Sequence, residues 1–243
     1  IIAIATPSAQ AAARATTEIP IVFSAVTDPA AAGFEIREDG TIDGNVTGTS
    51  DDIPVEQVFA LAEQLTPEVQ SYGFVYNIGE PNSVSVIERA KAYCDENGIP
   101  YVESTITNTS EVQQAVQSAA DRADALFTTI DNTVATAMVT ASQVATDAGK
   151  PFYVGADSMV MDGGFATVGI DYTVLGEETG KMAAQVLTGT PTSEIPVKTL
   201  DNFSTIINLD TANALGITIP EDILESATVI TGEEAGAAEE AGA

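Results

Sequence analysis

The chain has 243 residues, 44% of them hydrophobic and 6% aromatic, which is enough to bury the core of one large domain or two modest ones. Its 36 acidic residues against 8 basic ones give a net charge of −28, which makes nucleic acid a poor partner and leaves no polybasic membrane anchor. Histidine is absent and Cys94 is the only cysteine, which excludes histidine-dependent triads, zinc sites on histidine or paired cysteines, and an intramolecular disulfide.

Short apolar runs rich in β-branched residues alternate with helical patterns along most of the chain. Residues 54–65 and 83–98 repeat apolar side chains at the spacing of an amphipathic helix. This alternation predicts an α/β fold with parallel sheets, and consecutive apolar residues predict strands that are covered on both faces. The runs that predict strands are residues 1–6, 19–26, 73–77, 101–106, 125–130, 151–156 and 166–170.

Two segments interrupt the alternation. Residues 35–54 are polar and turn-rich without a helical pattern, so we expect the chain to pass there from one lobe to another. Residues 231–243 are acidic and alanine-rich with no apolar stripe, and we expect a flexible tail. Because the chain opens within the strand pattern "IIAIAT", we also expect further residues to precede Ile1.

Residues 176–182, "GEETGKM", resemble a phosphate-binding loop only superficially. The loop requires four residues between its glycines and a serine or threonine after the lysine, whereas here three residues intervene and Met182 follows Lys181. The sequence therefore predicts no cofactor, no metal site and no catalytic residue.

Polar side chains follow six of the predicted strands, at the point where each strand ends. Parallel strands bring such ends to one edge of a sheet, where α/β proteins bind their ligands. The same residue types also cap helices and form turns, and Pro29 predicts a helix directly after Asp28. The candidate ligand-binding residues are Thr6, Ser8, Thr27, Asp28, Asn77, Asn82, Ser83, Asp131, Asn132, Asp157 and Asp171.

This set offers hydroxyls, amides and carboxylates but no cation. The helix N-termini near Ser8 and Ser83 can hold an anion such as a carboxylate. The carboxylates that can hold an ammonium are those of Asp28, Asp131, Asp157 and Asp171. A ligand with both groups, such as an amino acid, fits this chemistry.

Several stretches follow one another in a specific order: "AIATPSAQAA", "IPIVFSAVTDPAAAGF", "NVTGTSD", "YNIGEPNSV", "FTTIDNTVA" and "ATVGIDYTVLGEETGKMAAQVL". From residue 1 to about 230 the sequence resembles the substrate-binding proteins of a bacterial ABC importer family, often described as binding tryptophan or other aromatic amino acids. The resemblance implies a type I periplasmic-binding-protein fold, in which two Rossmann-like lobes joined by three crossovers close around a ligand by hinge motion.

The resemblance also implies how the chain is divided. The N-terminal lobe would comprise residues 1–50 and 168–190, the C-terminal lobe 51–167 and 191–230, and "NVTGTSDD" the first crossover. Related proteins begin with a further strand–helix portion, so the N-terminal lobe would be incomplete at its start. The resemblance implies an extracytoplasmic protein, either a surface lipoprotein or periplasmic, with a membrane permease as partner, and we expect it to act as a monomer.

On this interpretation the protein is a solute receptor and not an enzyme, and its ligand is an amino acid, with aromatic ones favoured by the resemblance. Thr6 and Ser8 would take the carboxylate, with Thr27 and Asp28 beside them. In the other lobe, one end of the ligand would meet Asn77, Asn82 and Ser83, and its amino group Asp131 and Asp157.

Two alternatives remain open at this point. The effector domain of a LacI-like regulator shares the fold, although no basic helix-turn-helix pattern is present. An enzyme working through paired carboxylates is the other, although nothing in the sequence identifies a proton donor and nucleophile.

Overall fold

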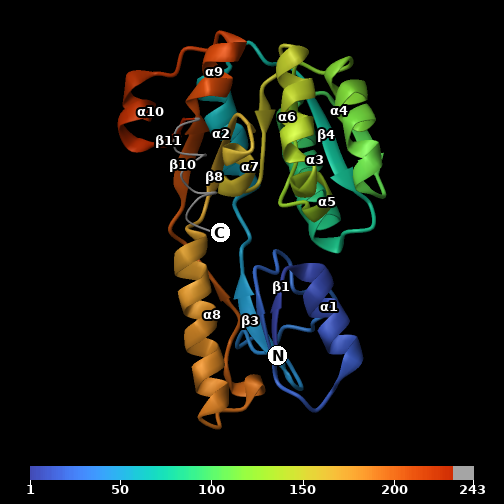
Figure 1. The fold of residues 1–243 in the computed structure, drawn as a ribbon, viewed down its shortest axis with the longest axis vertical. Coiled ribbons are helices and arrows are strands. Elements are labelled where there is room, and N and C mark those ends of the chain that lie inside the picture. The colour runs from blue at the N-terminus through green and yellow to red at the C-terminus, as the bar shows by residue number, and fades with distance from the viewer. Residues whose placement is uncertain (232–243) are drawn as a thin grey trace. The chain divides into compact units, whose positions relative to one another are not determined.

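The computed structural model describes residues 1–231, which divide into two compact units, each with its own sheet (Figure 1). The first unit contains Ile1–Ile53, Glu80–Ser85 and Ile170–Phe203. The second contains Pro54–Gly79, Val86–Gly169 and the described residues from Ser204 onward. Both units combine helices with parallel strands, which confirms the predicted α/β class.

The first unit is built on a four-stranded sheet in the order β1-β2-β3-β9, with every pair parallel. Ile2 of β1 is paired with Val22 of β2, so these two short strands end side by side. The carboxyl ends of β1, β2 and β3 therefore lie at one edge of the sheet in that order. The elements are β1 (Ile2–Ile4), α1 (Thr6–Ala15), β2 (Ile21–Ser24), β3 (Val46–Ser50), α8 (Tyr172–Leu187), η2 (Thr192–Glu194) and β9 (Lys198–Thr199).

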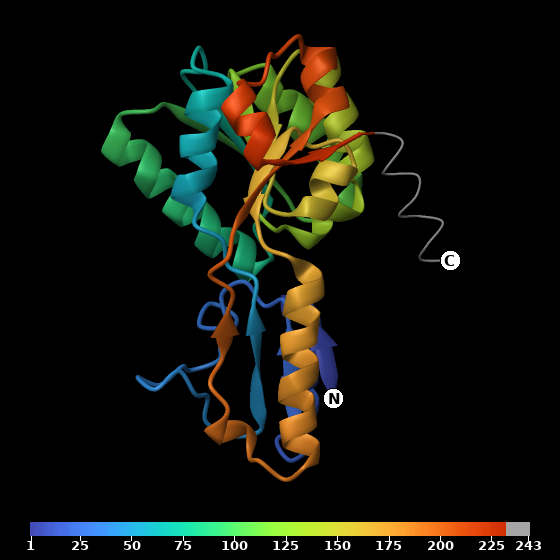
Figure 2. The same ribbon diagram turned by 90° about the vertical axis from the view of Figure 1, so that its left-hand side faces the viewer.

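Alternate side chains of β2 point to opposite faces of this sheet. Ile21 and Phe23 belong to an apolar cluster with Ala9 of α1. Val22 packs on the other face with Met182 of α8, which lies along the sheet in Figure 2. Helices therefore cover β2 on both faces, as its unbroken apolar sequence predicts.

The strand β3 lies within the polar, turn-rich segment 35–54, and all five of its residues are buried. Its hydroxyls find partners that are distant in sequence: Thr47 Oγ1 donates to the carbonyl of Ile195 at 2.7 Å, and Thr49 Oγ1 lies 2.8 Å from Thr179 Oγ1. A buried polar strand is stable when its side chains are hydrogen-bonded in this way. This strand was not among those predicted from the sequence, whereas the change from the first unit to the second falls between Ile53 and Pro54, within the predicted segment.

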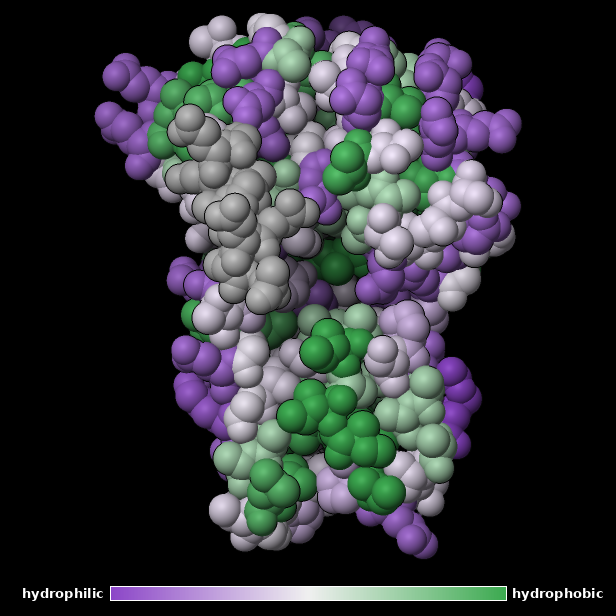
Figure 3. Space-filling view, in the orientation of Figure 1, coloured by the Kyte–Doolittle hydropathy of each residue, from purple (hydrophilic) through white to green (hydrophobic). Residues whose placement is uncertain are grey.

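β1 forms one edge of the sheet and presents apolar side chains to solvent. Ile2 and Ile4 are 60% and 67% exposed, whereas Ala3 between them is buried in the cluster with α1. Figure 3 shows the corresponding apolar patch over this part of the first unit. The face of β1 that carries α1 is covered, and the opposite face is exposed.

The second unit is built on a seven-stranded sheet in the order β11-β10-β8-β7-β6-β4-β5. Its strands are parallel except where β10 pairs antiparallel with β8. Its strands are β4 (Tyr72–Asn77), β5 (Tyr101–Ile106), β6 (Ala125–Phe127), β7 (Phe152–Tyr153), β8 (Ala166–Gly169), β10 (Ser204–Asn208) and β11 (Thr228–Ile230). The helices associated with it are α2 (Val55–Leu65), α3 (Pro81–Asn97), η1 (Thr109–Glu111), α4 (Val112–Ala120), α5 (Asn132–Thr136), α6 (Met138–Asp147), α7 (Asp157–Met161), α9 (Leu209–Leu215) and α10 (Glu221–Ser226).

Aromatic rings fill the core between α2 and the middle of this sheet. Phe59 of α2 contacts Tyr72 edge-on at a centroid distance of 4.8 Å and Phe127 at 5.3 Å. Phe74 lies edge-on to Phe127 at 6.0 Å. Edge-to-face pairs of this kind add to the burial energy, so this cluster anchors β4 and β6, whose carboxyl ends carry predicted site residues.

Other expectations differ from the structure. Pro29 opens a turn and not a helix, because Phe34 N donates to the carbonyl of Pro29 and Gly33 takes a positive φ of 93°. Residues 191–203, expected in the C-terminal lobe, lie in the first unit because β9 pairs with β3. The expected acidic tail lies, apart from residue 231, outside the described residues. No helix in the described part of the chain is long and apolar enough to cross a bilayer.

Candidate functional site

Three polar residues follow the adjacent parallel strands of the first unit in the order of the sheet. Thr6 comes after β1, Thr27 after β2 and Asp51 directly after β3. All three are at most 3% exposed. Neighbouring strands lie about 4.8 Å apart, so the ends of β1 and β3 are separated by roughly two strand spacings with the end of β2 between them. This carboxyl edge is where ligands bind in parallel α/β sheets.

Thr6 is the first residue of α1, and its buried Oγ1 has no hydrogen-bond partner. Ser8, also predicted for this site, is exposed in the first turn of the same helix. The unpaired N–H groups of a helix N-terminus attract an anion. Together with Thr6 Oγ1, this end of α1 offers donors to a carboxylate.

The backbone at this edge is strained at two alanines. Ala5, just before Thr6, has φ 69° and ψ 160°, a region that is essentially restricted to glycine. Ala25, two residues before Thr27, has φ 56°. Strain of this kind costs about 1–3 kcal/mol per residue and concentrates at functional sites. The two strained alanines are therefore a second observation, beside the buried polar residues, that favours a binding site at this edge.

Asp51 was not among the predicted residues, and its carboxylate is buried. Its Oδ2 accepts a hydrogen bond of 2.9 Å from the Tyr172 hydroxyl, while its buried Oδ1 has no partner. Burial raises the pKa of Asp51 above its ordinary value of 3.8, and hydrogen bonds from Thr27 and Tyr172 offset part of the shift. Without a ligand this carboxylate is poorly compensated.

We expect Asp51→Asn to increase the free energy of unfolding of the ligand-free protein near neutral pH. Because the folded-state pKa is raised, the folded protein binds a proton that the unfolded chain releases, so stability falls as pH rises from 3.8 through the raised pKa. Asparagine removes this penalty, and the gain should shrink as the pH is lowered toward about 4.

Urea unfolding of wild type and Asp51→Asn at about pH 7 and about pH 4 tests this expectation. The control is Asp147→Asn, which alters an exposed carboxylate that accepts a hydrogen bond from Gln143. A variant that is less stable than wild type near pH 7 would contradict the account of Asp51.

The side chains of the other predicted residues of the first unit form hydrogen bonds within that unit. Asp28 Oδ1 accepts from Ala31 N at 2.9 Å, and its Oδ2 accepts from the Ser85 hydroxyl. Asp171 is exposed and caps α8, accepting from the main-chain N–H of Thr173 and Val174. Asn82 and Ser83 are fully buried in the first turn of α3.

In the second unit, Asp131 joins two predicted residues. Its Oδ2 accepts from Asn77 N at 2.7 Å and its Oδ1 from Val134 N at 2.8 Å, so it caps α5 and holds the end of β4. The Asn77 side chain donates to Thr133 Oγ1 at 2.7 Å and accepts from Gly79 N. Asn132, the first residue of α5, is half-buried. Asn77 and Asp131 therefore belong to one hydrogen-bond network at the end of β4.

The remaining predicted residue, Asp157, is half-buried at the start of α7 and accepts from Ser158 N at 2.7 Å. Thr128 and Thr129 directly follow β6 in the second unit. They were not predicted as site residues, because they continue the apolar run of that strand. Their hydroxyl oxygens are buried without a hydrogen-bond partner. The signal available in the sequence was the pair of threonines at the end of that run.

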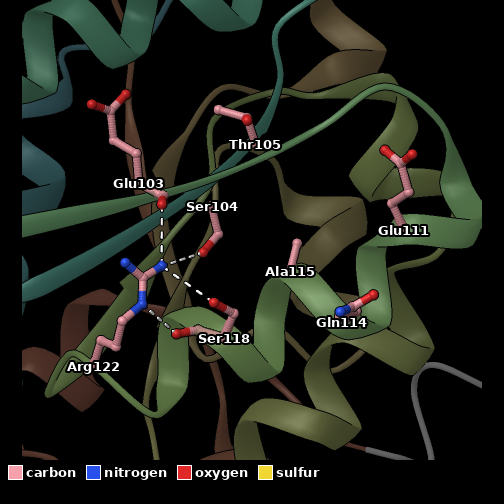
Figure 4. A pocket seen from close by; sticks show the side chains of 8 residues that line it. All are labelled: Glu103, Ser104, Thr105, Glu111, Gln114, Ala115, Ser118 and Arg122. Atoms are coloured by element: carbon pink, nitrogen blue, oxygen red, sulfur yellow. Dashed lines mark hydrogen bonds between the residues drawn. The ribbon is translucent and has the colours of Figure 1, made fainter.

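A separate hollow of about 470 Å³ lies beside the edge strand β5 (Figure 4). Arg122 closes one side by donating from Nη2 to Ser104 Oγ at 2.7 Å and from Nε to the carbonyl of Ser118 at 2.8 Å. Its lining includes none of the predicted site residues. Within residues 1–231, no group of three or more histidine, cysteine or acidic side chains is arranged to hold a metal ion.

Comparison with protein families and curated proteins gives two findings. The model of the family described as ABC transporter substrate binding protein matches residues 1–231. The tyrosine-binding protein of Clostridioides difficile (strain R20291) is 40% identical over 217 residues, which cover 88% of this chain and 62% of that protein. The chain thus spans less than two thirds of the length of this relative.

Two solved structures are informative in different ways. The crystal structure of the ABC domain in complex with L-Trp from Streptococcus pneumonia is 38% identical, with a TM-score of 0.89, covering 94% of this chain and 80% of that one. The periplasmic binding protein component of the arabinose ABC transporter from Shewanella sp. ANA-3 is only 14% identical, with a TM-score of 0.53, covering 96% and 74%. The second likeness shows the fold alone, and it agrees with the expected type I architecture.

Proposed function

The chain belongs to the family of ABC transporter substrate binding proteins, and we propose that it is a receptor that captures an amino acid with an aromatic side chain for an ABC importer. The observation that carries the choice of ligand is the similarity to a tyrosine-binding protein at 40% identity, joined by the L-Trp complex at 38%. Binding of an amino acid also suits an edge that offers hydroxyls and carboxylates.

The rest of the proposal follows from family membership. The partner is the membrane permease of the importer, the location is extracytoplasmic, and the two units correspond to the two lobes of a binding protein that acts as a monomer. The protein performs no chemistry on its ligand. The family match favours this receptor over the effector domain of a LacI-like regulator and over a carboxylate-based enzyme.

For the ligand carboxylate, the supporting geometry lies at the start of α1. Thr6 Oγ1 is buried without a partner, and Ser8 presents a second hydroxyl within the same turn. The end of a helix with free N–H groups is a favourable place for a carboxylate, and Arg or Lys is not required there. We assign the ligand carboxylate to this helix end.

The proposal predicts that aromatic amino acids stabilise the intact protein. A ligand that binds only the folded state adds about 2.7 kcal/mol at a concentration one hundred times its dissociation constant. Thermal unfolding should therefore shift upward with L-tyrosine or L-tryptophan and not with L-arabinose. A shift with the sugar alone, or none with any amino acid at millimolar concentration, would contradict the proposed ligand class.

A further inference from the structure

The carboxylates at the strand ends differ in how many hydrogen bonds their oxygens accept. Each aspartate predicted from sequence accepts at least one hydrogen bond from a nearby main-chain N–H, as a cap or turn residue does. Among the carboxylates of residues 1–231, Asp51 alone has a buried oxygen without a hydrogen-bond partner. The four that serve as caps or turn residues are Asp28, Asp131, Asp157 and Asp171.

Among residues 1–231, no lysine or arginine contributes to the charge environment of Asp51. The charge that acts on it is that of Asp52, which has the same sign. Tyr172 donates its hydroxyl to Oδ2 at 2.9 Å and Thr27 contributes a further hydrogen bond to the carboxylate, while Oδ1 is buried without a hydrogen-bond partner. A buried carboxylate in this state gains most from a cation that also donates hydrogen bonds.

We propose that Asp51 binds the ammonium group of the ligand, and that Tyr172 is the positioning residue that orients it. The inference rests on the proposed function, because it requires a ligand with an amino group. Thr6 and Asp51 follow β1 and β3, on either side of β2, so the carboxylate and the ammonium group on the Cα of an amino acid would meet different partners along one sheet edge. In this assignment the ammonium group is bound by Asp51 and not by Asp131 and Asp157, for which the sequence analysis predicted that contact.

The test compares each amino acid with its analogue that lacks only the amino group. Calorimetric titration of the intact protein uses L-tyrosine against 3-(4-hydroxyphenyl)propanoate, and L-tryptophan against indole-3-propanoate. Wild type should bind the amino acid about 30-fold more tightly or better, because the analogue leaves a buried carboxylate unpaired. In Asp51→Asn the affinity for the amino acid should fall by a similar factor, while that for the analogue should change little.

Two further variants separate the role of Asp51 from general damage. Tyr172→Phe should weaken amino-acid binding by about tenfold and spare the analogue, because a hydrogen bond to the charged carboxylate is lost. Asp147→Asn, on the exposed surface of α6, should retain wild-type affinity for both ligands.

The outcomes are distinguishable. An undiminished preference for the amino acid in Asp51→Asn overturns the assignment of Asp51 while leaving the proposed function intact. If wild type binds the amino acid and its analogue equally, an ammonium-binding carboxylate is ruled out altogether. If wild type binds neither, the proposed function itself fails and this inference fails with it.

Discussion

Replacement of Asp131 by alanine is expected to destabilise the protein by about 3 kcal/mol or more. The carboxylate is fully buried, and it accepts main-chain hydrogen bonds from Asn77 and Val134 at 2.7 and 2.8 Å. Alanine leaves both N–H groups buried without these bonds, at a cost of about 1–3 kcal/mol each. The end of β4 and the start of α5 lose their common anchor.

Asp171→Ala is the matched control, because Asp171 also caps a helix with two main-chain bonds but is exposed. Water can replace its carboxylate, so the cost should be near the ordinary value for a cap, about 1 kcal/mol. Urea unfolding followed by circular dichroism measures both. Equal losses in the two variants would show that burial of Asp131 adds nothing to its capping role.

Asp131 and Asp171 also show which parts of the site the sequence can predict. Each is followed by a helical pattern and caps the N–H three residues later, so the signal is local. The α/β class is predictable for the same reason, because strand and helix periods are read within one short window. The sequence could not decide between cap and ligand-binding residue, since both use the same residue types at the same strand ends.

The strand β3 and Asp51 were missed because their stability depends on distant partners. Thr49 is hydrogen-bonded to Thr179, which is 130 positions away in the sequence. Asp51 accepts a hydrogen bond from the hydroxyl of Tyr172, which is 121 positions away. In the sequence, "NVTGTSDD" has the composition of a turn, and only the folded sheet shows that its polar groups are satisfied. The residue that most resembles a ligand-binding group therefore lies where composition predicted no regular element.

Gly48 tests whether β3 holds this edge together, and Gly48→Ala is expected to destabilise the protein by about 3 kcal/mol. A Cβ at this position would lie 2.1 Å from the carbonyl oxygen of Phe23 and 2.5 Å from its ring. The contact is with backbone of the paired strand, so relief requires β2 and β3 to separate. Phe23 also stacks on Phe34 within the apolar cluster of the first unit, which resists that movement.

The matched control is Gly176→Ala in α8 of the same unit. Nothing lies within 4 Å of a Cβ placed at Gly176, and glycine in a helix interior costs about 1 kcal/mol relative to alanine. The same glycine-to-alanine change should therefore stabilise the protein at position 176 and destabilise it at 48, as measured by denaturant unfolding. Because Gly48 is three residues before Asp51, the variant should also weaken binding of L-tyrosine or L-tryptophan by the folded protein. A Gly48→Ala protein with wild-type stability would mean that the close pairing of β2 and β3 is not required for this edge.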